Sequence, residues 1–355
     1  MSTGDPGRGY TYPTNSNDPD QQDVLRNRLD LRSRAALNRA EYRITSDRMI
    51  DIRLGSGPAG NFDAAHLKAI HQHLFGEIYE WAGHTRNERP VVDGRPVEPI
   101  EFMTKGSTTF LPGSRLDRGL AEAFRPIRDP DVLKGSNVEQ FSAVAGRVMS
   151  ELNFVHPFRE GNGRVQEAFI ATLGQKYGHD VDFSVITKPR MLAASIAGAD
   201  DPANPAMRHL VEDATDRGRV AALRTAFEHL RQQGAEPLAQ DVRTARPGEQ
   251  ITGVLVATDT HSSSVNTGKG IIVVPTQDLG RQKAAAGDDV TVTVKSGFSA
   301  AAADRTAQEK PATSQRAASY WSGQVQKGQG ARSSPAGVMK EPDAPAAKPR
   351  GPKLR

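Results

Sequence analysis

Apolar residues recur at helical spacing on both sides of a short polar segment near the middle of the chain. The stripe before the segment comprises Phe141, Val144, Ala145, Val148, Met149, Leu152 and Val155. Spacings of three and four residues predict a buried helix face. After the segment the same spacing resumes at Val165, Ala168, Phe169, Thr172 and Leu173. Gly178 follows where a helix stop is expected. The pattern therefore predicts two core helices joined by one loop.

The joining segment runs His-Pro-Phe-Arg-Glu-Gly-Asn-Gly-Arg from His156 to Arg164. Pro157 disfavours helical geometry at His156, so the first helix is expected to end there. The loop leads into the start of the second helix, where free N–H groups and the helix dipole favour an anion. Gly161 and Gly163 allow positive φ and let a phosphate approach the backbone closely. The segment thus predicts a glycine-hinged anion-binding loop.

Each polar side chain of the segment has a chemical task that fits this prediction. His156 can take a proton near neutral pH. Glu160 is a hard oxygen ligand suited to Mg²⁺, and Asn162 offers both a donor and an acceptor. Arg164 can clamp phosphate oxygens, while Phe158 is expected to anchor the loop in the core. The alternative is a surface loop with an exposed histidine, which would not require all these residue types together.

The segment resembles the signature of the Fic-domain family, His-x-Phe-x-[Asp/Glu]-Gly-Asn-Gly-Arg, at every specified position. The stretch from Phe62 to Arg86 is similar to the first long Fic helix, ending in the family's Tyr-x-Trp-Ala-Gly at Tyr79 to Gly83. Tyr10 to Pro13, followed by Val24 to Leu29, is similar to the start of such domains. The resemblance covers roughly residues 10 to 215 and implies a mainly α-helical Fic fold.

What the resemblance implies is Mg²⁺-dependent transfer of AMP from ATP to a Ser, Thr or Tyr hydroxyl of a protein target. His156 would be the catalytic base and Glu160 the residue that holds Mg²⁺. The nucleotide phosphates would be bound by Gly161, Asn162, Gly163 and Arg164, together with Arg159. Reactions of this kind need positioning, charge neutralisation and one base, which this set supplies.

One position departs from the family pattern. Adenylylating members usually carry a second Arg three residues after the first, whereas this chain has Glu167 there. A carboxylate would repel an outer phosphate. Three alternatives follow: Glu167 points away while Arg159 or another cation substitutes, a different nucleotide or pose is used, or activity is weak. The rival function is a non-catalytic Fic-like scaffold.

Residues 105–112 have strand-like and turn-forming composition. In Fic domains a β-hairpin flap at this place docks the target by strand addition, so Thr108, Thr109, Phe110 and Leu111 are expected to contact the target. An ordinary connecting loop is the alternative. The family's inhibitory motif, Ser/Thr-x-x-x-Glu-Gly/Asn, does not occur in the sequence. A separate small antitoxin-like protein is therefore the expected inhibitor.

Composition narrows the class of protein. Apolar residues make up 37% of the chain, as in ordinary globular proteins. The chain has no cysteine, which excludes disulfides and thiolate metal sites and fits a bacterial cytoplasm. No apolar stretch is long enough to span a membrane, and the first 19 residues lack the apolar core of a signal peptide.

The net charge of +4 comes from the end of the sequence. Residues 301–355 hold ten basic and four acidic residues, which leaves 36 basic and 38 acidic residues in the rest. Such a basic, Pro- and Ala-rich segment predicts disorder. It is similar to the tails of Fic effectors exported by type IV secretion systems, which implies binding to a secretion coupling protein and delivery into a recipient cell. A solvated linker is the alternative. Nucleic acid is not an expected partner, because the tail has no fold that presents a groove.

Between these parts the hydrophobic period changes. Helices are predicted from Pro205 to about Asp216 and from Val220 to Gln233. The β-branched runs that follow predict strands at Gln250–Thr258, Gly270–Pro275 and Val290–Val294. They indicate a small β module, comparable to the oligonucleotide/oligosaccharide-binding (OB) module of the Fic effectors, although such a barrel needs about five strands.

The predicted division is a flexible N-terminus at 1–19, a Fic domain at 20–217, a helical connector at 218–244, the β module at 245–298 and a disordered basic tail at 299–355.

Three other patterns are weaker. Gly55-x-Gly57-x-x-Gly60 follows the strand-like Met49–Leu54, as in a dinucleotide fingerprint, but no second strand follows. The histidines at 66, 71 and 73 cannot share one helical face at zinc-ligand spacing. The polar cluster at 259–262 holds Asp, His and Ser, but such close neighbours do not predict a hydrolase triad.

Overall fold

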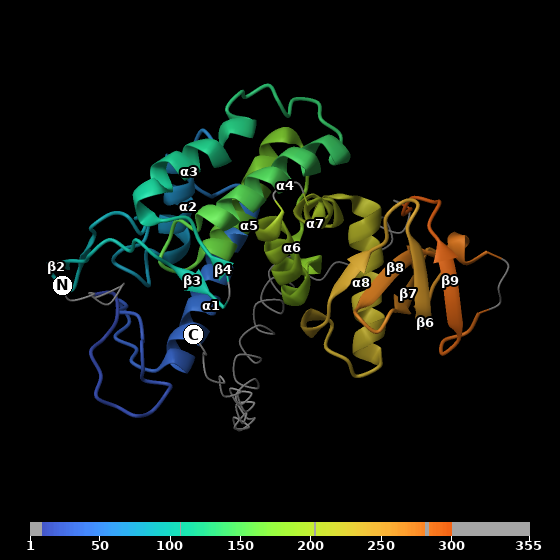
Figure 1. Cartoon of the computed structure of the whole chain (residues 1–355), viewed down its shortest axis with the longest axis horizontal. Helices are drawn as coiled ribbons and strands as arrows, with labels where there is room; N and C mark the ends of the chain where they lie inside the picture. Colours follow the sequence, from blue (N-terminus) through green and yellow to red (C-terminus); the bar gives the residue numbers. More distant parts are fainter. Residues whose placement is uncertain (1–8, 107, 202–203, 281–283, 300–355) are drawn as a thin grey trace, which may run out of the picture.

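The computed structural model describes residues 9–106, 108–201, 204–280 and 284–299. In Figure 1 helices form most of the molecule, and a β-sheet with helix α8 beside it forms one end. The helices are α1 (Arg34–Arg53), α2 (Ala64–Phe75), α3 (Leu116–Ala123), α4 (Val138–Val155), α5 (Asn162–Tyr177), α6 (Lys188–Asp200), α7 (Ala206–Thr215) and α8 (Arg217–Gln232). Short 3₁₀ turns lie at Gly113–Arg115, Arg125–Ile127, Phe183–Val185, Pro237–Ala239 and Thr276–Leu279. The predicted basic tail lies outside the described residues from residue 300 onward.

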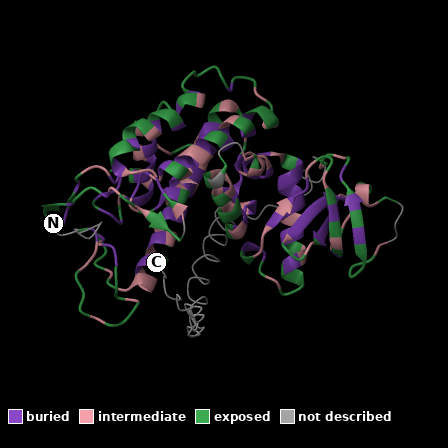
Figure 2. Ribbon diagram, in the orientation of Figure 1, coloured by how far each residue is buried: buried purple, intermediate pink, exposed green. Residues whose placement is uncertain are grey.

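Helix α4 is the central rod of the helical part. Asn137 and Gln140 close a reciprocal capping box at its start, which satisfies two otherwise unpaired N–H groups. The predicted apolar stripe is buried except for the partly buried Val144. Helices α3, α5, α6 and α7 pack around it, and Figure 2 shows how fully this centre is buried. The predicted core helix is therefore confirmed.

The second predicted core helix is α5, which begins at Asn162 and ends at Gly178 in a left-handed conformation. Gly178 has a φ of 82°, which a glycine adopts without steric cost and which commonly ends a helix. The two core helices and their stops agree with the sequence pattern. The loop between them comprises residues 156–161.

Two predicted elements differ from the structure. The helix expected to run to Tyr79–Gly83 ends at Phe75, because Gly76 caps it and turns follow, with Tyr79 and Trp81 buried in the core. The strand-like Met49–Leu54 forms the C-terminal end of α1 and its cap, Leu54. There Met49 and Ile52 continue a buried helical face that starts at Leu37, and this tertiary burial overrides local strand propensity.

Two short antiparallel hairpins lie between α2 and α3. The first joins β1 (Val91–Val92) to β2 (Arg95–Pro96), and the second joins β3 (Thr104–Lys105) to β4 (Thr108–Thr109). The second hairpin occupies the segment for which strand-like structure was predicted.

The five-stranded sheet has the order β5-β8-β7-β6-β9. Its strands are β5 (Val242–Thr244), β6 (Gln250–Thr258), β7 (Ser262–Asn266), β8 (Ile271–Pro275) and β9 (Asp289–Thr293). Only β5 and β8 are parallel. The three predicted strands correspond to β6, β8 and β9. Among the described residues the edge strands β5 and β9 do not pair with each other, so the OB-like barrel stays a prediction.

The sheet is tied to the helices before it. Asp213 of α7 is fully buried and accepts hydrogen bonds from Thr244 of β5 and from Arg246, the latter at 2.7 Å. Helix α8 packs against β5, β7 and β8. The first strand of the sheet, β5, begins at Val242, which lies inside the segment 218–244 that was predicted as a helical connector. Within the described residues, no helix combines the length and apolar character needed to cross a bilayer.

Candidate active site

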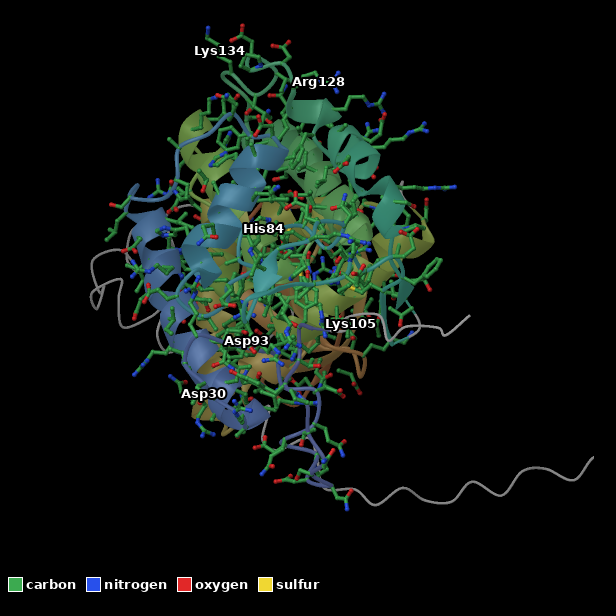
Figure 3. The ribbon with its side chains drawn as sticks, turned by 90° about the vertical axis from the view of Figure 1, so that its left-hand side faces the viewer. Asp30, His84, Asp93, Lys105, Arg128 and Lys134 are labelled. Carbon is green, nitrogen blue, oxygen red and sulfur yellow. The ribbon has the colours of Figure 1, made fainter. Side chains whose placement is uncertain are left out.

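A pocket of about 270 Å³ opens where the loop after α4 faces the β3–β4 hairpin. From the loop and the start of α5 come His156, Arg159, Glu160, Asn162 and Gly163; from the hairpin region come Met103, Thr104, Lys105 and Phe110. Five of the predicted site residues thus line one cavity together with Phe110 of the predicted flap. Figure 3 looks onto the face of the molecule that carries Lys105.

His156 ends α4 in a left-handed conformation, with φ of 47° and ψ of 60°. A residue with a Cβ pays a steric cost there, so the conformation needs support from its surroundings. The buried Arg86 gives it: its Nε–H donates to the His156 carbonyl at 3.0 Å, and its N–H donates to the Pro157 carbonyl at 2.8 Å. This turn directs the imidazole into the pocket.

The imidazole of His156 is half-buried and stacks on the Phe110 ring, with centroids 3.7 Å apart and planes 9° from parallel. Burial lowers the pKa of His156 to about 4, and the Lys105 ammonium lowers it further, whereas Glu160 opposes the shift. Both main causes disfavour the imidazolium. His156 is consequently neutral at neutral pH, the state in which it can accept a proton.

The start of α5 forms the second wall of the pocket. Gly161 caps the helix with φ of 83° and provides no side-chain cap, so the N–H groups of the first turn stay available to an anion. A Cβ at Gly161 would overlap the Phe75 ring, whereas one at Gly163 would enter open space. Gly163 does not use the positive φ that a glycine allows, because this residue already has a helical backbone. Its lack of a side chain instead keeps the pocket open.

The Asn162 side chain holds the loop closed. Its Oδ1 accepts from the Phe158 N–H at 2.9 Å, and its Nδ2 donates to the Phe158 carbonyl at 2.8 Å. Phe158 itself is fully buried, as its expected anchoring role requires. The Asn162 amide is therefore occupied within the loop, and its contribution to an anion site is the backbone N–H.

Glu160 is the one carboxylate among the residues that line the pocket. Its side chain is 46% exposed, and its Oε1 accepts from the Gly161 N–H at 2.9 Å. Mg²⁺ is commonly held by one or two carboxylates together with waters and substrate phosphates. The donor set thus fits Mg²⁺ bound along with a nucleotide. In the described part of the chain no cluster of three metal-binding side chains exists that could hold an ion without one.

Arg164 lies outside the residues that line the pocket. Its guanidinium forms an ion pair with the buried Glu41 of α1 and lies over the Phe75 ring, 4.7 Å from the centroid. A longer contact of 3.7 Å reaches Glu160. Burial opposes the charged form, but Glu41 and Glu160 outweigh it and raise the pKa of Arg164. Arg164, which was predicted to clamp the phosphates, is thus bound to Glu41 of α1 in this structure.

Glu167, the residue that departs from the family pattern, also lies outside the pocket lining. It is buried, and its Oε2 makes no hydrogen bond within the described residues. Burial raises the pKa of Glu167 to about 7, against the opposing charges of Arg164 and of Arg53 on α1. The charges that act on this carboxyl group thus come from α1 and α5, and the group does not line the pocket. The sequence led to the expectation that Glu167 would repel a phosphate in the pocket. Because its carboxyl group lies outside the pocket lining, this repulsion has no geometric basis.

The predicted flap residues divide into two pairs. Thr108 and Thr109 form β4, where Thr109 is exposed. Phe110 is buried against His156, and the Leu111 N–H donates to the Phe154 carbonyl at 3.1 Å. The second pair therefore anchors the hairpin to the end of α4 and leaves β3 and β4 as its more exposed part.

Several residues of the site were missed by the sequence analysis. Lys105 lines the pocket, Glu41 pairs with Arg164, and Arg86 supports His156. Lys105 stood inside the predicted flap, and its charge was the signal that could have marked it. Glu41 and Arg86 act on the site from 123 and 70 positions away in the sequence, which no local pattern reveals.

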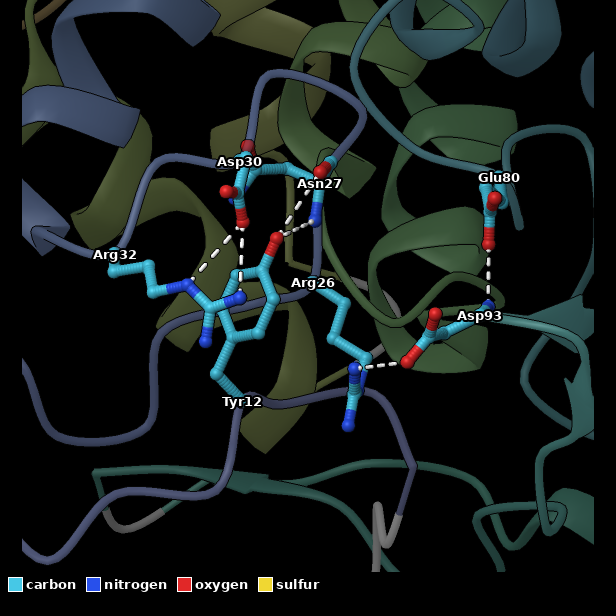
Figure 4. A pocket seen from close by; sticks show the side chains of 7 residues that line it. All are labelled: Tyr12, Arg26, Asn27, Asp30, Arg32, Glu80 and Asp93. Atoms are coloured by element: carbon cyan, nitrogen blue, oxygen red, sulfur yellow. Dashed lines mark hydrogen bonds and ion pairs between the residues drawn. The ribbon is translucent and has the colours of Figure 1, made fainter.

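A second pocket, of about 220 Å³, lies near the start of the described chain, and Figure 4 shows its lining. Four of its charges form two ion pairs, Arg26 with Asp93 at 2.6 Å and Arg32 with Asp30 at 3.0 Å, and Glu80 accepts from the Asp93 N–H at 2.6 Å. The Tyr12 hydroxyl donates to the Asn27 carbonyl at 3.1 Å. This arrangement fixes the N-terminal segment and gives no indication of a ligand.

The chain resembles known proteins over the elements that form this pocket. The profile of the Fic/DOC family matches residues 61–173, which include α2, both hairpins, α4 and the loop. A Sinorhizobium fredii protein named "Probable protein adenylyltransferase y4lH" is 32% identical over 174 residues, which cover 49% of this chain and 82% of that protein. The chain belongs to the Fic/DOC family.

Other members of the Fic/DOC family resemble a larger part of the chain. A protein adenylyltransferase of Bartonella henselae is 31% identical over 267 residues, which are 75% of this chain and 47% of that relative. The chain thus spans about half the length of this curated relative. The solved structure of the type IV secretion system effector protein BepA is 28% identical, with a TM-score of 0.71, and covers 82% of this chain and 97% of its own. The likeness therefore extends beyond residue 173 into the part that follows α5.

Proposed function

We propose that this Fic/DOC protein transfers AMP from ATP to a Ser, Thr or Tyr hydroxyl of a protein target. The observation that carries the proposal is the pocket itself, where a neutral imidazole, one carboxylate and the uncapped start of a helix face the same space. Relatives named protein adenylyltransferases, at 31% and 32% identity, support the same activity.

In the proposed reaction His156 accepts the proton of the target hydroxyl. The hydroxyl oxygen forms a bond to the α-phosphorus of ATP, the bond from that phosphorus to the bridging oxygen breaks, and pyrophosphate leaves with the bond's electron pair. The N–H groups at the start of α5 face the phosphate charge that develops. A neutral His156 suits this role, because an imidazolium has no lone pair to offer.

Glu160 would hold Mg²⁺ at this site, since it is the one carboxylate of the pocket lining and is partly exposed. When bound, Mg²⁺ neutralises phosphate charge. The other positive charges that face the cavity are Lys105 and Arg159. We propose that these two cations bind the outer phosphates in place of the family's second arginine, whose position in the sequence Glu167 occupies outside the pocket lining.

The β3–β4 hairpin is the proposed docking site for the target. Strand addition along an exposed hairpin would bring an extended target segment past the mouth of the pocket. Thr108 and Thr109 present the β4 backbone, while Phe110 and Leu111 hold it next to His156. Such docking would orient one hydroxyl toward the imidazole.

The remaining partners follow from the family. A small antitoxin-like protein is proposed as the inhibitor. A type IV secretion coupling protein is proposed to bind the basic tail, which lies outside the described residues, and to deliver the protein into a recipient cell. The BepA likeness supports the second proposal, because BepA is named as a type IV secretion effector.

Labelled ATP tests the function directly. The chain is incubated with Mg²⁺, bacterial or host lysate, and ATP labelled on either the α- or the γ-phosphate. Protein should acquire label from the α-position only, and His156→Ala should lose it by a factor of about 10² or more. Label from the γ-position would indicate phosphoryl transfer instead. Equal labelling by His156→Ala would refute the proposal, and no labelling in any lysate would favour the non-catalytic scaffold.

A further inference from the structure

His71 of α2 lies directly behind the loop and is completely buried. Its ring stacks on Phe158, with centroids 4.0 Å apart and planes 18° from parallel. It does not line the pocket, so it touches neither the proposed nucleotide nor the target.

Both ring nitrogens of His71 are hydrogen-bonded. The Gly83 N–H donates to Nδ1 at 2.8 Å, and Nε2 lies 3.2 Å from the Glu160 carbonyl oxygen. A backbone N–H can only donate and a carbonyl can only accept. Nδ1 must therefore be unprotonated and Nε2 must carry the hydrogen. One tautomer of the neutral ring satisfies both contacts.

The contact with Glu160 determines the orientation of one peptide unit. The carbonyl of the Glu160–Gly161 peptide accepts from His71, and the N–H of the same peptide donates to the Glu160 Oε1 at 2.9 Å. In a trans peptide these two groups point in opposite directions. Fixing the carbonyl toward the core therefore directs the N–H, and the carboxylate that caps it, toward the pocket.

We propose that His71 is a positioning residue for Glu160, and through it for the Mg²⁺ and nucleotide site. This inference rests on the proposed function. If His71 only filled the core, its ring alone would be sufficient. Positioning of Glu160 requires in addition the Nε2–H donor. Outer residues of this kind commonly change metal affinity by about 10- to 100-fold when removed.

Two variants separate the donor from the ring. His71→Phe keeps an aromatic ring against Phe158 but has no donor, whereas His71→Gln places an amide N–H near the position of Nε2 without a ring. His66→Phe is the matched control, because His66 is also buried on α2 but its ring contacts Pro58 and Phe62 instead of the loop. Binding of a non-hydrolysable ATP analogue to the full chain is measured by calorimetry with and without Mg²⁺.

In His71→Phe the Mg²⁺-dependent gain in analogue affinity should fall about tenfold or more, with a partial recovery in His71→Gln and no change in His66→Phe. Hydrogen exchange of the Gly161 amide should accelerate in His71→Phe relative to amides of the α4 core. Nitrogen NMR of the wild type should show the proton on Nε2 of His71. A proton on Nδ1, or unchanged Gly161 exchange in His71→Phe, overturns the inference. If the wild type transfers no AMP although these exchange and NMR results hold, the proposed function fails and the positioning role stands.

Discussion

Arg86 donates its Nε–H to the carbonyl of His156 at 3.0 Å, although 70 positions separate them in the sequence. The same guanidinium donates to the carbonyls of Ile100 and Leu111, which flank the β3–β4 hairpin, the former at 2.8 Å. Arg86 is fully buried, and every acceptor that the described structure gives its guanidinium is a backbone carbonyl. One side chain therefore sets the distance between the proposed base and the hairpin.

Arg86→Lys should weaken this connection. A lysine keeps the charge but has three donors and no planar fork, so several buried carbonyls would lose their partner. Each unsatisfied group costs about 1–3 kcal/mol, and an unfolding free energy lower by about 2–4 kcal/mol is expected from denaturant titration. Arg89→Lys is the control, since Arg89 is 63% exposed and pairs only with Glu98 at the surface. Equal effects of the two changes would contradict the role of Arg86.

Gly161 of the loop and Gly163 of α5 should respond in opposite ways to alanine. Gly161→Ala places a Cβ in a left-handed residue and against the Phe75 ring, so a loss of about 2 kcal/mol or more of stability is expected.

Gly163→Ala should leave the stability unchanged or raise it by up to about 1 kcal/mol, since the position is helical and has open space. The methyl group would enter the pocket and reduce affinity for the ATP analogue. Thermal unfolding and calorimetric binding, measured on both variants, check the pair. An unaffected affinity in Gly163→Ala would place the phosphates elsewhere.

Removing Lys105 should raise the pKa of His156. Burial is the larger cause of the value of about 4 and remains in Lys105→Met, so the pKa should rise but stay below 6.5. The titration is followed by NMR of the His156 ring. Lys134→Met is the control, because Lys134 is 79% exposed and pairs with Asp131 away from the pocket. A pKa that falls or stays constant would mean that the ammonium does not face the imidazole.

Glu167 should make stability depend on pH near neutrality. Its pKa in the folded protein, about 7, lies above the ordinary 4.5, so the folded state holds the proton more tightly. Stability is then full at acidic pH and is lost as the pH rises through about 7. Glu167→Gln removes this loss and should be more stable than the wild type at pH 8, by about 1–3 kcal/mol. Urea unfolding at two pH values measures the effect; a parallel pH dependence of both proteins would show that Glu167 ionises freely.

The sequence predicted the elements that repeat a local pattern. The apolar stripe from Phe141 to Val155 could be predicted from its helical period alone, and it forms the buried face of α4. The helix stop at Gly178 could be predicted from the glycine, which caps α5. Strand β7 was missed because its three consecutive serines predict a loop, although all three are buried between neighbouring strands. Pairing partners, and not the residues of β7 themselves, make it a strand.

The candidate site also has a part that the sequence could predict and a part that it could not. The motif placed His156 and Glu160 next to the helix start, since chain connectivity alone brings them together. It could not show that Arg164 faces Glu41, because that choice depends on how α1 packs across α5. The direction of Glu167 depends on the same packing.

The buried carboxylate of Asp213 bears on any attempt to separate the two ends of the molecule. A chain cut between α8 and β5 would keep Asp213 but lose Thr244 and Arg246, leaving the buried carboxylate with its longer contact of 3.8 Å to Arg219. A cut at that point should therefore destabilise the helical part, whereas a cut that also removes α7 takes Asp213 with it. Because α7 also packs along α4, which ends at His156, the sheet is linked through α7 to the helix that carries the proposed base.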